Sequence, residues 1–210
     1  MSEHTLKKRP YTDEEAKKIL ATVMSPDTTD WHYNTHHKGY ITKRNEIEQK
    51  LSEGGKLLRD GANANYSVFG ELKRRETFNA NGAILHDIFW ENLGGDGKIE
   101  KAQELSKKII QDFGSIEEWK SDFVATTLAA KNSGWGVLVV DKLSDGKLRN
   151  LLIDEHGVGA IWGSEPLIAC DVFEHAYYHK DGPKRAGYIN NFINNLHWGR
   201  IEERYKNYSK

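Results

Sequence analysis

The 210-residue chain has a single cysteine, four prolines and no apolar run that approaches the length of a membrane span. One cysteine excludes an intrachain disulfide and any metal site built from several thiolates. Lys plus Arg (30) nearly balances Asp plus Glu (31), so no overall field would attract nucleic acid or an acidic membrane. We therefore expect neither a nucleic-acid partner nor a membrane. Residues 1–10 lack the apolar stretch of a secretory signal, which predicts a cytoplasmic protein.

Three common site patterns are also missing from the sequence. The His-Glu-x-x-His pattern of zinc proteases is absent. A di-iron carboxylate bundle needs two Glu-x-x-His motifs, and none lies on a suitable apolar face. No Gly-x-x-x-x-Gly-Lys loop supports nucleotide binding, and the glycines of residues 94–97 are interpreted as a helix-ending turn.

Capping residues and periodicity predict a helical first half. Thr12 and Glu15 form a capping box that opens a short helix to about residue 22. Residues 26–30 are rich in capping residues and predict a break. Longer helices are expected over about residues 31–51 and 65–93, the first ended by Gly54 and Gly55, so the two form a hairpin.

The second half has mixed character after a candidate boundary at residues 94–97. Residues 99–113 are amphipathic, and Ser115 with Glu118 caps a further helix to about residue 131. Strands are predicted over 134–143, 147–154 and 166–171, the first two joined by a hairpin turn at 144–146, and residues 185–205 are predicted to be helical. The fold class is therefore α+β, with an N-terminal arm (1–29), an α-helical hairpin domain (30–94) and a mixed C-terminal domain (98–210).

The segment Asp171–Tyr178, Asp-Val-Phe-Glu-His-Ala-Tyr-Tyr, places a carboxylate four residues before the imidazole of His175. A carboxylate oxygen and an imidazole nitrogen can bind the same divalent metal. Because a strand that ends in a carboxylate and is followed by Glu-His has no ordinary packing reason, this pair indicates a metal site.

Two further histidines lie in apolar or aromatic helical stretches. His32, His36 and Tyr40 recur every four residues and share one helix stripe, although a solvated or aromatic-packed face is an alternative. His86 lies on a core-facing stripe, where a satisfied buried histidine is the alternative. Three imidazoles and one carboxylate would make a ligand set suited to iron or manganese.

These segments together resemble the iron/manganese superoxide dismutases over about residues 30–198. The 171–178 segment is similar to the family signature, with Phe173 where many members carry Trp. Residues 32–40 and 78–93 are similar to the two metal-binding helices, and residues 113–115, 132–136 and 195–198 to further landmarks. No single fold constraint would place all of them in this order.

The resemblance implies an antioxidant oxidoreductase, a superoxide dismutase that converts superoxide to O2 and H2O2 by alternate reduction and oxidation of one Fe or Mn ion per subunit. The ligands would be His32, His86, Asp171 and His175, with solvent as the fifth. The C-terminal domain would hold a three-stranded antiparallel sheet flanked by helices. The alternative is a non-catalytic structural subunit of the same fold, which would be free to lose the four ligands.

The resemblance also assigns residues around the ligands. Tyr40 and His36 would line the entrance to the metal, and Trp135 would wall the pocket. Many members place a glutamine on the second helix or in the loop after the second strand, where it bonds the metal-bound solvent. The helix position is Gly82 here, so His156 in the loop is the candidate for that role.

Finally, the resemblance implies a homodimer or homotetramer. Glu174 would bond the partner subunit's His175, and the partner subunit's Tyr178 would reach His36. Iron and manganese use the same ligands, so the sequence predicts either metal. The role of the N-terminal arm is left open by the resemblance.

Overall fold

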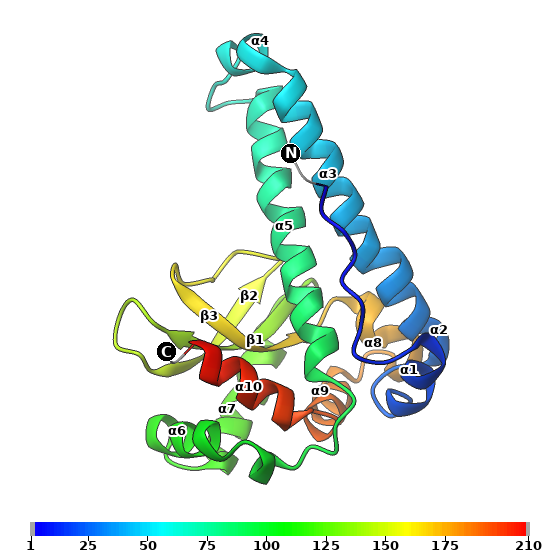
Figure 1. The fold of residues 1–210 in the computed structure, drawn as a ribbon, viewed down its shortest axis with the longest axis vertical. Helices are drawn as coiled ribbons and strands as arrows, with labels where there is room; N and C mark the ends of the chain where they lie inside the picture. The colour runs from blue at the N-terminus through cyan, green and yellow to red at the C-terminus, as the bar shows by residue number, and fades with distance from the viewer. Residues whose placement is uncertain (1–2, 209–210) are drawn as a thin grey trace.

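A helical hairpin stands on a mixed body of helices and a three-stranded sheet in the computed structural model, which describes residues 3–208 (Figure 1). The predicted α+β fold class is confirmed. The arm that precedes the first helix runs alongside the hairpin, and α10 lies across the lower part of α5 (Figure 1).

The N-terminal half is entirely helical apart from its arm and connections. The capping box of Thr12 is present, since the Glu15 N–H donates to Thr12 Oγ1 (3.2 Å) and the Thr12 N–H donates to Glu15 Oε2 (2.8 Å). The elements are α1 (Asp13–Ile19), α2 (Pro26–Asp30), the π-helix η1 (Trp31–His37), α3 (Lys38–Glu53), α4 (Gly55–Asp60) and α5 (Val68–Asn92).

Residues 26–30 contradict the prediction for this half, and two further details differ from it. Residues 26–30 form the short helix α2 rather than a break, because Ser25 caps it and Pro26 fits its first turn. The predicted helix over 31–51 begins as a π-helix, and only from Lys38 is it an α-helix. The glycine pair does end α3, but Gly55, at φ +51°, also turns the chain into the unpredicted helix α4.

The C-terminal half alternates helices with a short run of strands. Ser115 caps its helix as predicted, because its side chain accepts a hydrogen bond from the Glu118 N–H (3.0 Å). The elements are the 3₁₀ helix η2 (Ile99–Lys101), α6 (Gln103–Phe113), α7 (Ile116–Ala129), β1 (Gly134–Asp141), β2 (Leu148–Asp154), β3 (Ser164–Asp171), α8 (Glu174–Asp181), α9 (Arg185–Asn194) and α10 (Trp198–Tyr208).

The sheet has the order β2-β1-β3, and both pairings are antiparallel. Every residue of β1 is buried, as expected for a central strand covered on both faces. The register sets Trp135 at one end of β1 opposite Asp171, the last residue of β3. The sheet therefore brings a bulky aromatic side chain next to the candidate carboxylate ligand.

The tail is not one helix over 185–205, as predicted, but two. Residues 195–197 leave the helix and pair with the end of α5 instead. Asn195 accepts from the Gly94 N–H (2.8 Å) and donates to the Ile19 carbonyl (2.9 Å), and Leu196 forms an isolated bridge with Leu93. These tertiary bonds replace the helical ones that would have joined α9 to α10.

One apolar core extends from the base of the hairpin into the mixed body. Its largest fully buried side chains are aromatic and come from α5, α7, β1 and α9. Cys170 is fully buried within it. Among residues 3–208, no helix has the length and hydrophobicity needed to cross a membrane.

Gly136 tests how tightly β1 packs beside the site. A Cβ there would lie 1.8 Å from Thr127 Oγ1. We expect Gly136→Ala to lower the free energy of unfolding by about 2–3 kcal/mol, because an overpacked core must shift its backbone or side chains. Urea unfolding of the metal-free protein measures this change. Gly187→Ala in the exposed part of α9, with nothing within 4 Å of its Cβ, should instead raise stability slightly; equal effects would contradict the packing described.

Candidate metal centre

The four predicted donors meet although they come from four different elements. His32 lies in the π-helix η1, His86 in α5, Asp171 at the end of β3 and His175 in the first turn of α8. One donor atom from each lies within 4.8 Å of the others. His32, His86 and Asp171 are fully buried, and His175 is nearly so.

One oxygen of Asp171 is the centre of this cluster. Its Oδ2 lies 3.1 Å from His32 Nε2, 3.3 Å from His175 Nε2 and 3.5 Å from His86 Nε2. The other oxygen, Oδ1, accepts a hydrogen bond from the Phe173 N–H (2.8 Å). This backbone bond fixes the carboxylate so that Oδ2 faces the three imidazoles.

The imidazoles are oriented for coordination. His86 Nδ1 lies 2.6 Å from the Gly82 carbonyl, so Nδ1 carries the proton and Nε2 presents its lone pair to the cluster. Neither His86 Nε2 nor His175 Nε2 has a hydrogen-bond partner among the described residues. Buried nitrogens without a partner are costly, and a shared cation would satisfy them. The donor set, three nitrogens and a carboxylate oxygen, fits iron or manganese.

The protonation states of His32, His86 and Asp171 also suit metal coordination. Burial lowers the pKa of His32 to about 4 and lowers the pKa of His86 well below its ordinary value, so both rings are neutral near pH 7. Burial alone would raise the pKa of the Asp171 carboxyl, but the neighbouring His175 and the hydrogen bond with His32 hold it below its usual range. The cluster therefore offers two neutral imidazoles, those of His32 and His86, and an ionised carboxylate.

His156 lies beside the cluster in the loop after β2. Trp135 Nε1–H donates to its Nδ1 (3.0 Å), so a neutral His156 must carry its proton on Nε2. Burial lowers the pKa of His156 to about 4, which keeps the ring neutral. A Cβ at Gly82 would lie 3.2 Å from His156 Nε2 and 2.9 Å from the Tyr40 ring. The missing side chain at residue 82 thus makes the room that His156 and Tyr40 fill.

Aromatic rings hold His156 in this position. Its ring stacks on Phe173 (4.8 Å between centroids, 14°) and meets the edges of Phe78 (4.5 Å) and Tyr40 (4.7 Å). Tyr40 also lies 5.2 Å from His86. Burial, and then the charge of Asp171, raises the pKa of Tyr40, so its phenol stays protonated.

The remaining predicted residues surround His175. His36 is half-buried, and its ring stacks on that of His175 at 4.0 Å and 11°. Burial lowers the pKa of His36. Glu174 and Tyr178 lie on α8 and are exposed. The structure thus brings His36, Tyr40, Trp135 and His156 to the ligand cluster and leaves Glu174 and Tyr178 at the surface of the chain.

Several neighbours of the site could not be identified from the sequence. His37 is fully buried, stacks on His86 (5.3 Å) and lies 3.4 Å from Asp87. Its place beside His36 in the sequence was the available signal. Phe78 and Phe173 both pack against the ring of His156. Nothing local marks them, since the loop that carries His156 is distant in sequence.

The fit between Gly82 and His156 can be tested by adding one carbon. We expect Gly82→Ala to displace His156 and weaken its bond from Trp135, because the new Cβ would be too close to two rings. A shifted indole N–H resonance of Trp135 in NMR spectra would report this. Gly39→Ala, in α3 with nothing within 4 Å of its Cβ, serves as the control and should leave that resonance in place. An unmoved resonance in both variants would contradict the proposed fit.

Comparison with known proteins agrees with this geometry. The model of iron/manganese superoxide dismutases, alpha-hairpin domain, matches residues 3–94, and the model of iron/manganese superoxide dismutases, C-terminal domain, matches residues 101–204. The manganese superoxide dismutase 1 of Haloferax volcanii is 39% identical over 98% of this chain and 96% of its own length. The iron superoxide dismutase of Aquifex aeolicus is 38% identical, with coverages of 87% and 84%.

A third relative, the manganese superoxide dismutase 1 of Haloferax mediterranei, is 47% identical over 72% of this chain and 99% of its own length. The relatives thus include both manganese and iron enzymes at similar identity. The resemblance seen in the sequence is confirmed by both domain models and by relatives that cover nearly the whole chain, so this chain belongs to the iron/manganese superoxide dismutases.

Proposed function

We propose that this protein is a superoxide dismutase, which converts two superoxide anions and two protons into O2 and H2O2. The observation that carries the proposal is the meeting of four donors, three of them fully buried, within 4.8 Å of one another: His32, His86, Asp171 and His175. One Fe or Mn ion per subunit would bind there. Relatives named for each metal are about equally similar, so either metal is proposed.

The charge of the donor set suits an anionic substrate. Three neutral imidazoles and one carboxylate contribute a single negative charge, so the loaded site keeps a net positive charge that attracts superoxide. The bound ion would supply the redox chemistry, since it alternates between the +3 and +2 oxidation states.

Proton supply and substrate orientation are the work of the surrounding residues. His156 carries its proton on Nε2, and Tyr40 keeps its phenolic proton, so both can donate hydrogen bonds beside the ligands. Trp135 fixes the tautomer of His156 and excludes water with its fully buried indole. We propose Tyr40, His36, His156 and Trp135 as the catalytic surroundings of the metal.

The alternative, a structural subunit without chemistry, is less well supported. Such a protein would have no reason to keep four converging donors at a buried site. Here all four are retained, and the carboxylate is further fixed by a backbone hydrogen bond from Phe173.

Removal of one ligand tests the site. We expect His175→Ala to lose its metal and more than about 100-fold of its activity, because the ion would keep only three of its four protein ligands. Metal content and superoxide disproportionation would be measured on the same sample. His179→Ala removes an exposed histidine from the same helix and should keep both. A fully active, metal-free His175→Ala protein would refute the site.

Elemental analysis of the unmodified protein tests the metal itself. One Fe or Mn per chain is expected, with activity restored by reconstitution with at least one of the two. Zinc bound at this site instead would contradict the proposal, because zinc has no redox chemistry.

We further propose that the protein is a homodimer or homotetramer whose contact includes Glu174 and Tyr178. Both are exposed on α8, and Tyr178 exposes 52% of its surface. Glu174 directly precedes the ligand His175, so a partner bound to this face would touch the surroundings of the metal. Glu174 would accept a hydrogen bond from the partner subunit's His175, and the partner subunit's Tyr178 would approach His36.

Sedimentation tests this interface. We expect Glu174→Ala to weaken association by about 2–5 kcal/mol, because the partner histidine would lose a charged hydrogen-bond acceptor in a buried contact. Sedimentation velocity over a range of concentrations gives the dissociation constant. Glu203→Ala, at an exposed position of α10, is the control. An unchanged assembly in Glu174→Ala would contradict the interface.

Two finer points stay predictions. The division into arm (1–29), hairpin domain (30–94) and C-terminal domain (98–210) is supported by the glycine turn at residues 94–97. A cytoplasmic location is predicted from the sequence alone.

A further inference from the structure

The N-terminal arm, for which the sequence gives no role, is attached along the hairpin at several points. Its first anchor is His4, whose N–H donates to Asn45 Oδ1 (2.9 Å) and whose carbonyl accepts from Asn45 Nδ2 (2.9 Å). The His4 ring also lies 3.0 Å from Glu48. All of these contacts are made to α3, away from the ligand cluster.

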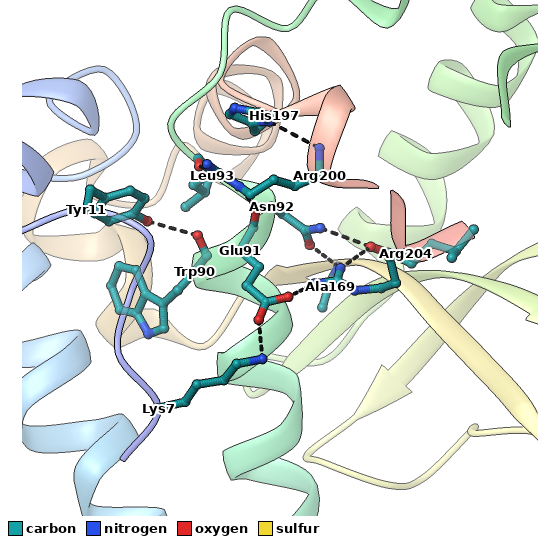
Figure 2. A network of polar contacts seen from close by, with 11 residues as sticks. Lys7, Tyr11, Trp90, Glu91, Asn92, Leu93, Ala169, His197, Arg200 and Arg204 are labelled. Atoms are coloured by element: carbon teal, nitrogen blue, oxygen red, sulfur yellow. Dashed lines mark hydrogen bonds and ion pairs between the residues drawn. The ribbon is translucent and has the colours of Figure 1, made fainter. Parts of the chain in front are cut away.

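A second anchor lies close to the ligands. Figure 2 shows the arm passing the indole of Trp90, with Lys7 reaching Glu91 and Tyr11 reaching the Trp90 carbonyl. The Tyr11 hydroxyl donates to that carbonyl at 3.0 Å. Tyr33, the residue after the ligand His32, donates its hydroxyl proton to the Lys7 carbonyl (2.9 Å). The arm is thus bonded both to η1, the helix that carries His32, and to the end of α5.

Arg9 lies between these bonds and is buried. Its side chain exposes only 2% of its surface and pairs with the exposed carboxylate of Asp13. The guanidinium carbon lies 4.0 Å from the Tyr33 ring centroid and 5.0 Å from that of Trp90. Two of its nitrogens, Nε and Nη1, have no hydrogen-bond partner among the described residues. The faces of the two rings therefore provide much of the compensation for this buried charge.

The Trp90 and Tyr33 side chains both adjoin the ligand His32. The Trp90 ring meets the edge of the His32 ring at 5.0 Å and 63°. Tyr33 adjoins His32 within the π-helix η1, a form of helix that is rare and depends on its surroundings. Arg9 therefore contacts the residue that packs against His32 and the residue that follows it in the chain.

We propose that Arg9 is a positioning residue, which holds His32 at the metal site by fixing Trp90 and Tyr33 from the arm. The inference rests on the proposed metal site. Without the guanidinium, both rings would gain freedom and His32 could leave the cluster, while the other three donors would stay in place. The arm would then control how firmly the metal is kept.

The experiment compares Arg9→Met, which keeps an unbranched apolar stem but removes the charged guanidinium group, with His4→Ala, which removes the distant anchor of the same arm. Each variant, loaded with the metal found in the natural protein, is placed in excess chelator and metal release is followed. We expect release from Arg9→Met to be about tenfold faster, in line with losses seen when residues behind metal ligands are changed. The electron paramagnetic resonance spectrum of the bound metal should change as well.

Stability is measured separately, by unfolding of the metal-free forms. His4→Ala should be destabilised without faster release or an altered spectrum. Arg9→Lys, which keeps a charge but not the planar fork, should release metal at an intermediate rate, and it decides the matter if Arg9→Met does not fold. Release at the natural rate from the Arg9 variants would overturn the inference, as would equally faster release from His4→Ala.

The two proposals fail in different ways. If the natural protein binds neither Fe nor Mn, the proposed function is wrong. If His175→Ala loses its metal while the Arg9 variants keep theirs with an unchanged spectrum, only the role of Arg9 is wrong.

Discussion

The rest of the structure depends on the contacts that surround the buried carboxylate of Asp171. An isolated buried charge would be strongly unfavourable, so it must be met by partners from every side. The Phe173 N–H bonds one oxygen, and the nitrogens of His32, His86 and His175 lie 3.1–3.5 Å from the other. Two of these histidines belong to the hairpin, whereas Asp171 and His175 belong to the mixed body. The site therefore exists only while the two halves of the chain are held in register.

The junction between the halves meets this requirement with hydrogen bonds at the end of α5 (Figure 2). The Asn92 amide donates to the Leu167 carbonyl and accepts from the Ala169 N–H, both at 2.9 Å, so α5 is tied to β3 two residues before Asp171. Arg200 of α10 donates to the carbonyls of Glu91 and Leu93. Carbonyls that the end of a helix leaves unpaired are thus satisfied by the opposite half, which fixes the spacing of His86 and Asp171.

What the sequence predicted well was local or carried by a dense motif. Thr12 and Ser115 marked helix starts because a capping side chain bonds within its own four residues. The ligands were found because Asp171 and His175 stand close together in a recognisable segment. The π-helix around His32 could not be predicted, since its surroundings include the arm more than twenty residues earlier. For the same reason nothing in the sequence distinguishes Arg9 from the neighbouring Lys7 and Lys8, and only the fold shows it buried against Tyr33 and Trp90.

The departure at Gly82 is explained by the geometry around His156. His156 Nδ1 accepts a hydrogen bond from the Trp135 N–H. In the neutral ring the proton is therefore on Nε2, which can act only as a donor. His156 Nε2 would lie 3.2 Å from a Cβ at residue 82, which leaves no space for a longer side chain there. A group reaching the site from α5 and one reaching it from the loop after β2 would therefore compete for the same volume. The chain uses the loop, and the bare backbone at Gly82 follows from that choice.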